Sequence, residues 1–372
     1  MIRIGFIGWR GMVGSVLMER MKKENDFKNF EYLFFSTSNI GGEGPEIGFD
    51  VPPLKDAYDV KLLSTLDMVV TCQGSDHTKK VYPELRKSGW KGYWIDASSA
   101  LRMEKDSIIV LDPVNRHVID AGLSSGVKTY VGGNCTVSLM MMALGGLFAE
   151  NLIEWVSSMA YQAASGAGAE NMKELVRQMA QLGVVSRDLL DDPKSSAIEL
   201  DAVVTRELRS ESFPVKNFGA PLAASLLPWI DTLMESGQTR EEWKGSAELN
   251  KILQPERFIP VDGICVRVGA MRCHSQGLTI KLKKDVPLDE VSDIIKNGNQ
   301  WVKVIQNDKA TTIRELTPAA VNGTLTVPIG RLRKMLMGPE YVTGFTVGDQ
   351  LLWGAAEPIR RIFNIIIEYL SN

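Results

Sequence analysis

Three glycines, at positions 8, 11 and 14, do most to limit the folds open to this 372-residue chain. They follow an apolar, strand-like run, Ile2–Ile7, and precede a segment with helical apolar spacing, Val13–Lys22. Such a tight turn needs residues without a β-carbon, so that backbone can come close to a bound group. The helix then directs unpaired N–H groups and a charge of roughly +0.5 at the turn. The segment therefore predicts a strand–turn–helix unit that binds the pyrophosphate of a dinucleotide.

The first third of the chain continues to alternate short apolar runs with helix-like segments. The runs end in small or hydrogen-bonding residues, which are either turn residues or ligand contacts. The alternation predicts an α/β class with a doubly wound parallel sheet, the dinucleotide-binding Rossmann domain. Further strands are expected at Tyr32–Phe35, Met68–Thr71 and Tyr93–Ile95, and a helix at Lys79–Ser88.

The pattern changes after Gly132–Gly133–Asn134, where we expect a second domain of the α+β class. We assign residues 1–133 to the Rossmann domain and residues 134–354 to the second domain. A C-terminal helix within 355–372 has an apolar stripe, so we expect it to complete the first domain. The expected elements are helices at Val137–Asn151, Gly166–Gln181 and Pro358–Leu370, and strands at Trp155–Gln162, Pro255–Arg272 and Leu278–Lys283.

Composition excludes several classes of protein. Hydrophobic residues make up 44% and charged residues 23%, and the net charge of −3 shows no basic stripe, so we expect no nucleic-acid partner. The longest apolar stretch, Val137–Leu147, is too short to span a bilayer, and no signal peptide is evident, so we expect no membrane partner. The four cysteines are too scattered for a disulfide framework. We therefore expect a reduced, cytoplasmic protein.

The end of the second expected strand bears on the choice of dinucleotide. Sites for NAD place a carboxylate there, on the ribose 2′-hydroxyl. This strand instead ends in Ser36–Thr37–Ser38, which offers hydrogen-bond donors, and Arg10 in the glycine turn supplies a cation. The segment favours NADP over NAD; the alternative is a Ser-Thr-Ser run that only caps a turn.

Cys135 lies in a glycine-rich turn directly before an apolar helix. A helix N-terminus favours the thiolate, and a nearby imidazolium would do the same, so we expect a thiol pKa below its usual value of about 8.5. This placement predicts a catalytic nucleophile. The alternative is a buried structural cysteine, a role that fits Cys72, Cys265 and Cys273.

The chain offers three histidines as a base: His77, His117 and His274. The first two lie in polar surroundings of the first domain, whereas His274 shares its segment with Arg267, a fork donor suited to a carboxylate. His274 is therefore the expected acid–base group, with a structural histidine as the alternative. We expect no metal, because no second Cys/His cluster has ligand spacing.

A set of segments, which runs from residue 5 to residue 358 and so covers nearly the whole chain, carries a resemblance to a known family. The segments are GFIGWRGMVGSVL, FFSTS, TCQG, GYWIDA, GGNCTVSLM, YQAASGAGA, EEWKG, VDGICVRVGAMRCHSQ, RELTPAAV and GDQLLWGAAEP. Together they resemble the aspartate-semialdehyde dehydrogenases of the enteric-bacterial type. The resemblance implies the NADP-dependent, phosphorylating oxidation of L-aspartate 4-semialdehyde to L-4-aspartyl phosphate. It also implies the reverse reaction in the biosynthesis of lysine, threonine, methionine and diaminopimelate.

The same resemblance implies roles for individual residues. Cys135 would be the acyl-thioester nucleophile and His274 its acid–base partner. Arg267 would hold the substrate α-carboxylate, Glu241 its amino group, and Gln162 would position it. Inorganic phosphate would be bound by Arg102 and Lys244. The implied NADP contacts are Gly8, Arg10, Gly11, Met12, Val13, Thr37, Ser38, Gln73, Ser165, Gly166, Ala167, Gly168, Ala169, Pro193 and Gln350.

The resemblance further implies a homodimer, in which residues 134–354 form a catalytic and dimerisation domain with a mixed sheet. One departure from the family pattern is visible at Ala167, where close relatives carry glycine. Because alanine adds a single methyl group, it puts little of the implied cofactor loop in doubt.

The implied mechanism starts with attack of the Cys135 thiolate on the aldehyde, passes hydride to the nicotinamide, and ends with release of the acyl group by phosphate. One alternative is another thioester-forming, phosphate-using dehydrogenase, acting on an N-acetylglutamate or glyceraldehyde phosphate scaffold, which would not need a free amino group near Glu241. The other is an NADP-binding sensor or assembly protein without catalysis. It would keep the glycine turn but need neither Cys135 nor His274.

Overall fold

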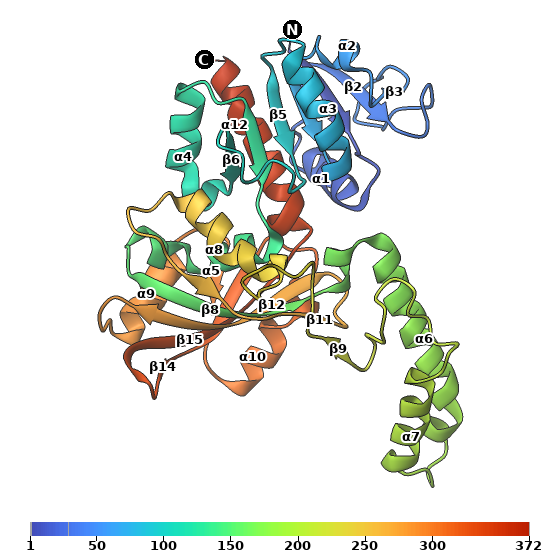
Figure 1. Ribbon diagram of the computed structural model, residues 1–372. Coiled ribbons are helices and arrows are strands. Elements are labelled where there is room, and N and C mark those ends of the chain that lie inside the picture. Colours follow the sequence, from blue (N-terminus) through green and yellow to red (C-terminus); the bar gives the residue numbers. More distant parts are fainter. Residues whose placement is uncertain (1, 29, 372) are drawn as a thin grey trace.

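The computed structural model describes residues 2–28 and 30–371 and contains two β-sheets, one in each half of the molecule (Figure 1). The first is a seven-stranded parallel sheet in the order β3-β2-β1-β4-β5-β7-β6. The strand order reverses between β1 and β4, and ligands of such sheets bind at that reversal. Its strands are β1 (Arg3–Ile7), β2 (Glu31–Ser36), β3 (Lys55–Asp56), β4 (Met68–Thr71), β5 (Tyr93–Asp96), β6 (Ser107–Val110) and β7 (Thr129–Gly132).

Helices cover both faces of this sheet, because its central strands are apolar on both sides. Phe6 and Ile95 pack with α1, α4 and the C-terminal helix on one face, whereas Val69 and Trp94 pack with α2 and α3 on the other. This is the doubly wound arrangement that the sequence predicts, and the predicted α/β class is confirmed. The helices of this half are α1 (Met12–Lys23), α2 (Val60–Leu63), α3 (Ser75–Lys87) and α4 (Asp112–Ser124).

The C-terminal helix α12 (Glu357–Ser371) returns to the first sheet, as expected from its apolar stripe (Figure 1). Ile359, Phe363 and Ile366 are buried in the same core as strands β1, β4 and β5. Ion pairs fix its start, where Arg20 of α1 lies 2.9 Å from the buried carboxylate of Glu357. The helix therefore ties the end of the chain to its beginning.

The second sheet has eight strands, of which seven follow the order β13-β14-β15-β12-β8-β11-β9 while β10 pairs with β8. It is mixed, because β8 pairs antiparallel with β12 and parallel with β11, and the predicted mixed sheet is confirmed. Its strands are β8 (Ile153–Gln162), β9 (Leu226–Leu227), β10 (Val261–Asp262), β11 (Cys265–Val268), β12 (Cys273–Leu282), β13 (Val302–Val304), β14 (Val327–Met335) and β15 (Gly338–Asp349).

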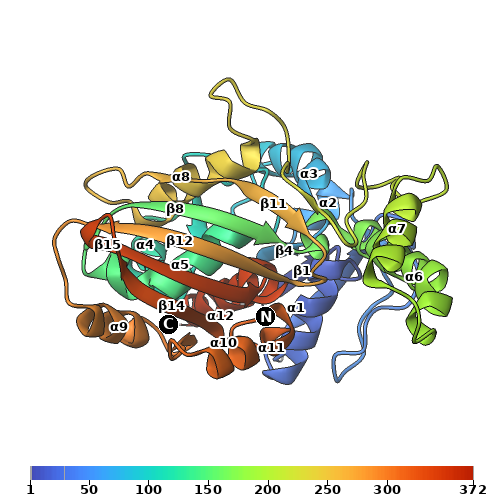
Figure 2. The ribbon, with the colours of Figure 1, turned by 90° about the horizontal axis from the view of Figure 1, so that it is seen from below.

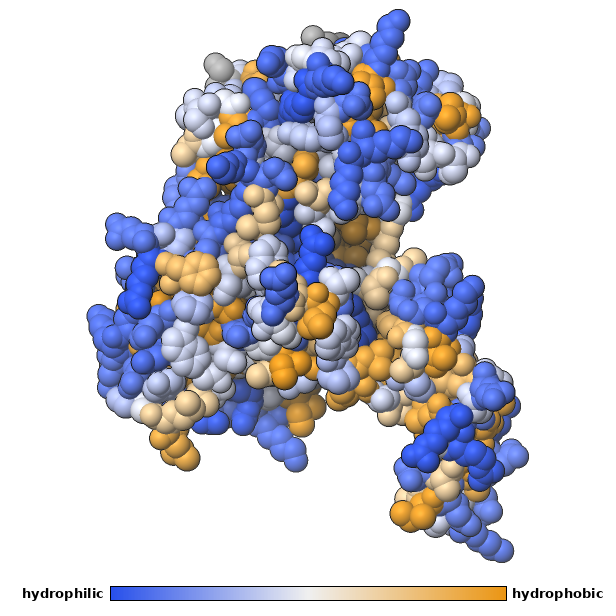
Figure 3. Space-filling model, in the orientation of Figure 1, coloured by the Kyte–Doolittle hydropathy of each residue, from blue (hydrophilic) through white to orange (hydrophobic). Residues whose placement is uncertain are grey.

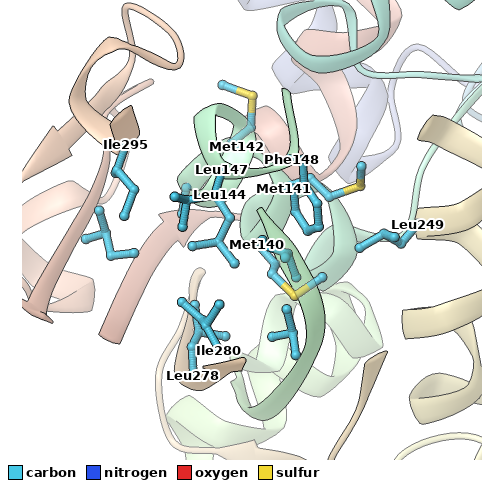
Figure 4. Packing of buried hydrophobic residues seen from close by; sticks show 14 of the residues in the cluster. Met140, Met141, Met142, Leu144, Leu147, Phe148, Leu249, Leu278, Ile280 and Ile295 are labelled. Carbon is cyan, nitrogen blue, oxygen red and sulfur yellow. The ribbon is translucent and has the colours of Figure 1, made fainter. Parts of the chain in front are cut away.

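Helix α5 (Cys135–Ala149) leads from the first sheet into the core of the second. Its residues are apolar almost all round, and a helix of that kind is stable only where neighbours cover every side. Figure 4 shows its methionines and leucines between Ile295 of α9 (Leu288–Asn297) and Leu249 of α8 (Arg240–Leu253), with Ile280 of β12 below them. The packing fixes the first residue of α5, Cys135, between the two sheets.

A helical arm projects from the second half of the molecule (Figures 1 and 3). It consists of α6 (Ala169–Asp191) and α7 (Ala197–Leu208), which begins with a capping box between Ser196 and Glu199. The sequence predicts α6 to begin at Gly166, whereas a 3₁₀ turn (Ala164–Ala167) comes first and α6 runs ten residues beyond the predicted end. The predicted end at Gln181 is therefore too early, although apolar residues continue at helical spacing at Leu182 and Leu189.

Other differences from the expected elements are local. The predicted strand at Pro255–Arg272 is wrong as one element, since β10 and β11 are separate strands joined through Gly263. Within the described residues, the longer helices contain no stretch apolar enough to cross a membrane. The remaining helices of the second half are α10 (Lys309–Glu315), α11 (Pro318–Val321) and a π-helical turn (Leu352–Ala356) before α12.

Candidate active site

A cleft of about 560 Å³ lies between the two sheets and the base of the arm. Figure 3 shows the recess between the upper half of the molecule and the arm. Side chains from both halves of the molecule line this cleft, so the site is complete only when both sheets have formed. Of the residues predicted for the site, those that line the cleft are Met12, Val13, Arg102, Cys135, Gln162, Ser165, Gly166, Ala167, Gly168, Glu241, Lys244, Arg267 and Gln350.

Cys135 is the first residue of α5 and is partly buried at the cleft wall. Asn134 caps the helix, because its Oδ1 accepts the backbone N–H groups of Thr136 at 3.0 Å and Val137 at 3.2 Å. The N–H of Asn134 itself donates to the buried carboxylate of Glu248 at 2.6 Å. The backbone around the sulfur is therefore fixed from both sides.

His274 lies directly behind the sulfur, with its Nε2 3.2 Å from Cys135 Sγ. The two residues come from different sheets, since Cys135 follows β7 of the first and His274 lies in β12 of the second. The other ring nitrogen, Nδ1, accepts the backbone N–H of Ala163 at 3.0 Å. The structure thus brings together the two residues that the sequence pairs as nucleophile and acid–base group.

The ionisation of this pair differs from the sequence expectation. Burial, with a smaller contribution from the Glu241 carboxylate, raises the pKa of the Cys135 thiol to about 12, although the charges of Arg102, Arg267 and Lys244 lower it. Burial, followed by the charge of Arg267, lowers the pKa of His274 to about 3. The predicted thiolate–imidazolium pair is therefore wrong for the ligand-free site, which holds a thiol beside a neutral imidazole, because the loss of water outweighs the helix field.

Arg267 supplies a buried cation at the cleft. Its guanidinium donates from Nη1 to the backbone carbonyl of Ala163 at 2.8 Å, which leaves other N–H groups toward the cleft that it lines. Burial lowers the pKa of Arg267 below its usual value, although arginine keeps its charge at any physiological pH. A fork of N–H donors in a dry site suits a carboxylate.

Helix α8 turns two charged residues, Glu241 and Lys244, toward the cleft at a spacing of three. Glu241 Oε2 lies 2.8 Å from Lys244 Nζ, and Glu241 Oε1 accepts the side-chain N–H groups of Asn134 at 2.9 Å and Gln162 at 3.1 Å. Although burial raises the pKa of Glu241, the Lys244 ammonium and these donors lower it below the usual value overall. Glu241 is therefore an anion beside a cation, and both reach the cleft.

Arg102 is the second cation at the same wall. Its Nε donates to the carbonyl of Gly132 at 2.7 Å, and its Nη1 lies 3.0 Å from Glu248 Oε1. Both side chains of this pair are almost fully buried. The remaining N–H groups of Arg102 lie at the cleft with Lys244, which places two cations where an anionic ligand would enter.

The glycine turn has the backbone that a dinucleotide requires. Gly8 has a φ of +74°, and a β-carbon there would come within 2.5 Å of the Gln73 nitrogen. A β-carbon on Gly14 would lie 2.2 Å from the Gly8 carbonyl oxygen, so α1 packs too closely for any side chain. Arg10 Nη2 donates to Ser36 Oγ at the end of β2, 3.1 Å away. The glycine turn therefore contacts the ends of both β2 and β4, next to the point where the strand order of the sheet reverses.

The other predicted cofactor residues fall into two groups. Thr37, Ser38 and Gln73 are exposed at the ends of β2 and β4, beyond the cleft wall. Ser165 is buried beneath the cleft and accepts a hydrogen bond from Gln350 Nε2 at 2.7 Å. Thr37, Ser38 and Gln73 therefore follow the carboxyl ends of strands in the first sheet, whereas Ser165 belongs to the 3₁₀ turn after β8.

Pro193 is the exception. Ala169 begins α6, and Pro193 follows the last residue of this 23-residue helix by two positions. A helix of that length rises about 33 Å, at 1.5 Å per residue, so the exposed Pro193 lies at the far end of the arm. Pro193 therefore does not line the cleft within this chain, because α6 is a continuous helix, and its contact with NADP stays a prediction.

Comparison with known proteins identifies the family and the fold of the chain. Two family models match the chain: the semialdehyde dehydrogenase NAD binding domain over residues 3–122, and the semialdehyde dehydrogenase dimerisation domain over residues 144–353. The chain belongs to the semialdehyde dehydrogenase family. Aspartate semialdehyde dehydrogenase from Francisella tularensis is 47% identical, with 98% of this chain and 100% of that chain covered and a TM-score of 0.93. The predicted resemblance, and the prediction of an enzyme, are confirmed.

More distant structures share the fold of this semialdehyde dehydrogenase. Aspartate semialdehyde dehydrogenase II from Vibrio cholerae, solved with ASA, is 22% identical over 99% of this chain and 98% of that chain, with a TM-score of 0.78. The enzyme from Candida albicans, solved with NADP, is 16% identical over 96% of each chain, with a TM-score of 0.63. The family model of the first half establishes a nicotinamide cofactor for this chain.

Sequence reasoning missed several residues of the semialdehyde dehydrogenase site. Asn134 had a signal, since asparagine directly before a helix is a preferred cap. Glu248 had a weaker one, because it shares a helix face with Glu241 and Lys244. Gly354, which touches Cys135, and Asp231, which lies 3.0 Å from Lys244, had none, since their partners are far apart in the sequence or in irregular loops. Among residues 2–28 and 30–371, no group of His, Cys, Asp and Glu is placed to hold a metal ion.

Proposed function

We propose that this chain catalyses the NADP-dependent, phosphorylating oxidation of L-aspartate 4-semialdehyde to L-4-aspartyl phosphate through a thioester on Cys135, and the reverse reduction in biosynthesis. One observation carries the proposal. Cys135 Sγ lies 3.2 Å from His274 Nε2, in a cleft that Arg102, Lys244 and Arg267 make cationic. A nucleophile beside a hydrogen-bonding imidazole, with anion sites on its open side, is the arrangement that acyl transfer to phosphate needs.

The proposed substrate contacts follow from charge. Arg267 offers a buried fork to the α-carboxylate, and the Glu241 carboxylate offers an anion to the amino group. Gln162 donates to Glu241 at 3.1 Å and faces the same space, so it orients both the substrate and this carboxylate. An anion and a cation at opposite ends of the substrate select an α-amino acid over an aldehyde that lacks the amino group.

The proposed phosphate site consists of Arg102 and Lys244. Both are held by carboxylates on α8, Glu248 at 3.0 Å and Glu241 at 2.8 Å, and both reach the cleft that Cys135 also lines. Each cation therefore has a fixed position before an anion binds, which reduces the entropy that is lost when the side chains are ordered on binding.

The chemistry proceeds at the Cys135 sulfur. The sulfur attacks the aldehyde carbon, the S–C bond forms, and the carbonyl electron pair moves to oxygen, which His274 faces. When bound, NADP⁺ supplies the hydride acceptor, and the aldehyde hydrogen leaves with its electron pair as the C=O bond of the thioester forms. A phosphate oxygen then adds to this carbonyl, the C–S bond breaks, and Cys135 is restored. Because both the thiohemiacetal and the thioester form on its sulfur, Cys135 is indispensable to this reaction.

The residues of the first half fit NADP. Arg10 is held at the end of β2 by Ser36, and Thr37 and Ser38 offer further donors where NAD sites carry a carboxylate. The glycine turn, Met12, Val13, the Ser165–Ala169 segment and Gln350 would complete the contacts. We divide the chain at 133/134, with residues 355–372 completing the NADP-binding half.

The proposed assembly is a homodimer through the second sheet. Figure 2 shows one face of this sheet without a covering helix. Aromatic pairs lie across it, Trp155 with Tyr341 and Tyr161 with Phe345, and Met159 is 41% exposed beside them. An apolar sheet face of this kind is usually covered by a partner. The pathway to lysine, threonine, methionine and diaminopimelate, and a cytoplasmic location, belong to the same proposal.

An NADPH-formation assay with L-aspartate 4-semialdehyde, with and without phosphate, tests the proposed function. We expect turnover only when NADP⁺ and phosphate are both present. Cys135→Ala should abolish it, while Cys72→Ala, at the end of β4, serves as the matched control. Retained turnover in Cys135→Ala, or equal turnover with a glyceraldehyde phosphate substrate, would overturn the proposal.

A further inference from the structure

The hydrogen bond on the far side of the His274 ring fixes where its proton sits. The backbone N–H of Ala163 donates to Nδ1 at 3.0 Å, and His274 is 1% exposed, so no water competes for this nitrogen. An atom that accepts an N–H must offer a lone pair, so Nδ1 carries no proton. The ring hydrogen therefore lies on Nε2, which points at the Cys135 sulfur 3.2 Å away.

On the proposed function, we infer that His274 works as a neutral Nε2–H hydrogen-bond donor held in one tautomer by the Ala163 backbone, and not as the base that deprotonates Cys135. The nitrogen that faces the sulfur already carries a hydrogen, so it has no lone pair to accept another. Proton uptake at Nδ1 would set two N–H groups against each other in a buried site.

The charged groups around the ring also oppose its protonation. A β-carbon placed on Gly166 would lie 2.8 Å from Arg267 Nη1 and 3.2 Å from His274 Cε1, so the guanidinium and the imidazole approach the same point. Arg267 is bound to the carbonyl of Ala163 at 2.8 Å, the residue whose N–H holds the ring. The nearby anion is Glu241, whose oxygens are occupied by Lys244, Asn134 and Gln162. The positive charge of Arg267 therefore dominates the electrostatic field at the His274 ring, in agreement with the low pKa of His274.

The reaction balances without a proton on Nδ1. The Cys135 thiol loses its proton to water in the open cleft, and the Nε2–H group stabilises the sulfur anion. On attack, the S–C bond forms and the carbonyl oxygen gains the electron pair and takes over the Nε2–H hydrogen bond. Hydride leaves to NADP⁺ and the thioester forms. When hydrogen phosphate adds and the C–S bond breaks, the phosphate proton leaves to solvent, so the imidazole is unchanged throughout.

Nuclear magnetic resonance of protein labelled with ¹⁵N in histidine alone tests this assignment directly. The chain has three histidines, so the ligand-free enzyme gives three imidazoles, and the His77→Gln and His117→Gln variants identify the third. We expect His274 to show a protonated Nε2 and an unprotonated Nδ1 that do not change between pH 6 and pH 9. A protonated Nδ1, alone or together with Nε2, at neutral pH would overturn the inference.

A matched pair of variants tests the same point by kinetics. A glutamine at position 274 carries an amide N–H near the level of Nε2, whereas an asparagine reaches only the level of Nδ1. If a fixed donor suffices, kcat of His274→Gln should exceed that of His274→Asn by at least about tenfold, since one oxyanion donor is worth roughly 10²-fold. Equal losses in the two variants would overturn the inference.

Failure of the proposed function and failure of the inferred donor role of His274 give different experimental results. If wild-type enzyme forms no NADPH from the semialdehyde, the proposed function fails, whatever the tautomer. If wild-type enzyme is active but Nδ1 carries a proton, the function stands and the donor role of His274 fails. Circular dichroism of both position-274 variants shows whether they are folded, and the resonance measurement on wild-type protein decides the question if either is not.

Discussion

Gly354 lies against Cys135, and a β-carbon added to Gly354 would lie 2.7 Å from the β-carbon of Cys135. Gly354 belongs to the π-helical turn Leu352–Ala356, and such turns often occur at functional sites. The contact joins the segment before α12 to the first residue of α5. The turn therefore fixes how far the sulfur extends into the cleft.

Replacement of Gly354 by alanine should displace Cys135 and lower kcat. A misplacement of about 1 Å costs on the order of 10²-fold, because the reacting atoms lose their near-attack geometry. NADP affinity, measured by fluorescence titration, should change far less. Gly183→Ala on α6 is the matched control, since nothing lies within 4 Å of a β-carbon there. Wild-type kcat in Gly354→Ala would show that the contact has no positioning role.

Glu248 connects the proposed phosphate site to the nucleophile. Its carboxylate binds Arg102 Nη1 at 3.0 Å and the N–H of Asn134 at 2.6 Å. Glu248→Gln should raise KM for phosphate about tenfold, since Arg102 loses a charged partner, and leave KM for the semialdehyde within about twofold. The loss of a counter-ion beside buried Arg102 should also cost on the order of 3 kcal/mol of stability.

Steady-state kinetics with each substrate varied, together with urea unfolding, measures both effects. Glu235→Gln, an exposed carboxylate in the same half, is the control and should change neither. An unchanged KM for phosphate in Glu248→Gln would show that the Glu248 carboxylate does not support the phosphate site.

The site illustrates what a sequence of this kind can and cannot predict. Local sequence patterns predicted the glycine turn, strand β4 and the position of Cys135 at the start of a helix, because each of these depends on neighbours within a few residues. Glu248 was missed because its partners Arg102 and Asn134 are 146 and 114 residues away, and only the packing of α5 on α8 brings them together. The ionisation of Cys135 was predicted wrongly for the same reason, since burial comes from the assembled sheets.

His274 should make the stability of the fold depend on pH. Its pKa falls from 6.5 to about 3 on folding, mainly through burial, so between these values the unfolded chain binds a proton that the folded chain does not. Stability is therefore lost as the pH falls below 6.5. This group should account for a loss of about 2 kcal/mol between pH 7.5 and pH 5.0. Urea unfolding of wild type and His274→Gln at both pH values isolates it, and an identical pH dependence in the two proteins would contradict it.

The uncovered face of the second sheet leads to a prediction about assembly. Met159 is 41% exposed on β8, two residues before Tyr161, which packs against Phe345 on the same face of the sheet. Figure 2 shows that no helix covers this face. A carboxylate buried without a partner in the proposed dimer interface costs several kcal/mol, so Met159→Glu should shift the proposed dimer to a monomer at micromolar concentration. Ile313→Glu, 61% exposed on α10, is the matched control and should leave the dimer intact. Sedimentation velocity separates the two states, and a Met159→Glu protein that sediments as wild type would place the interface elsewhere.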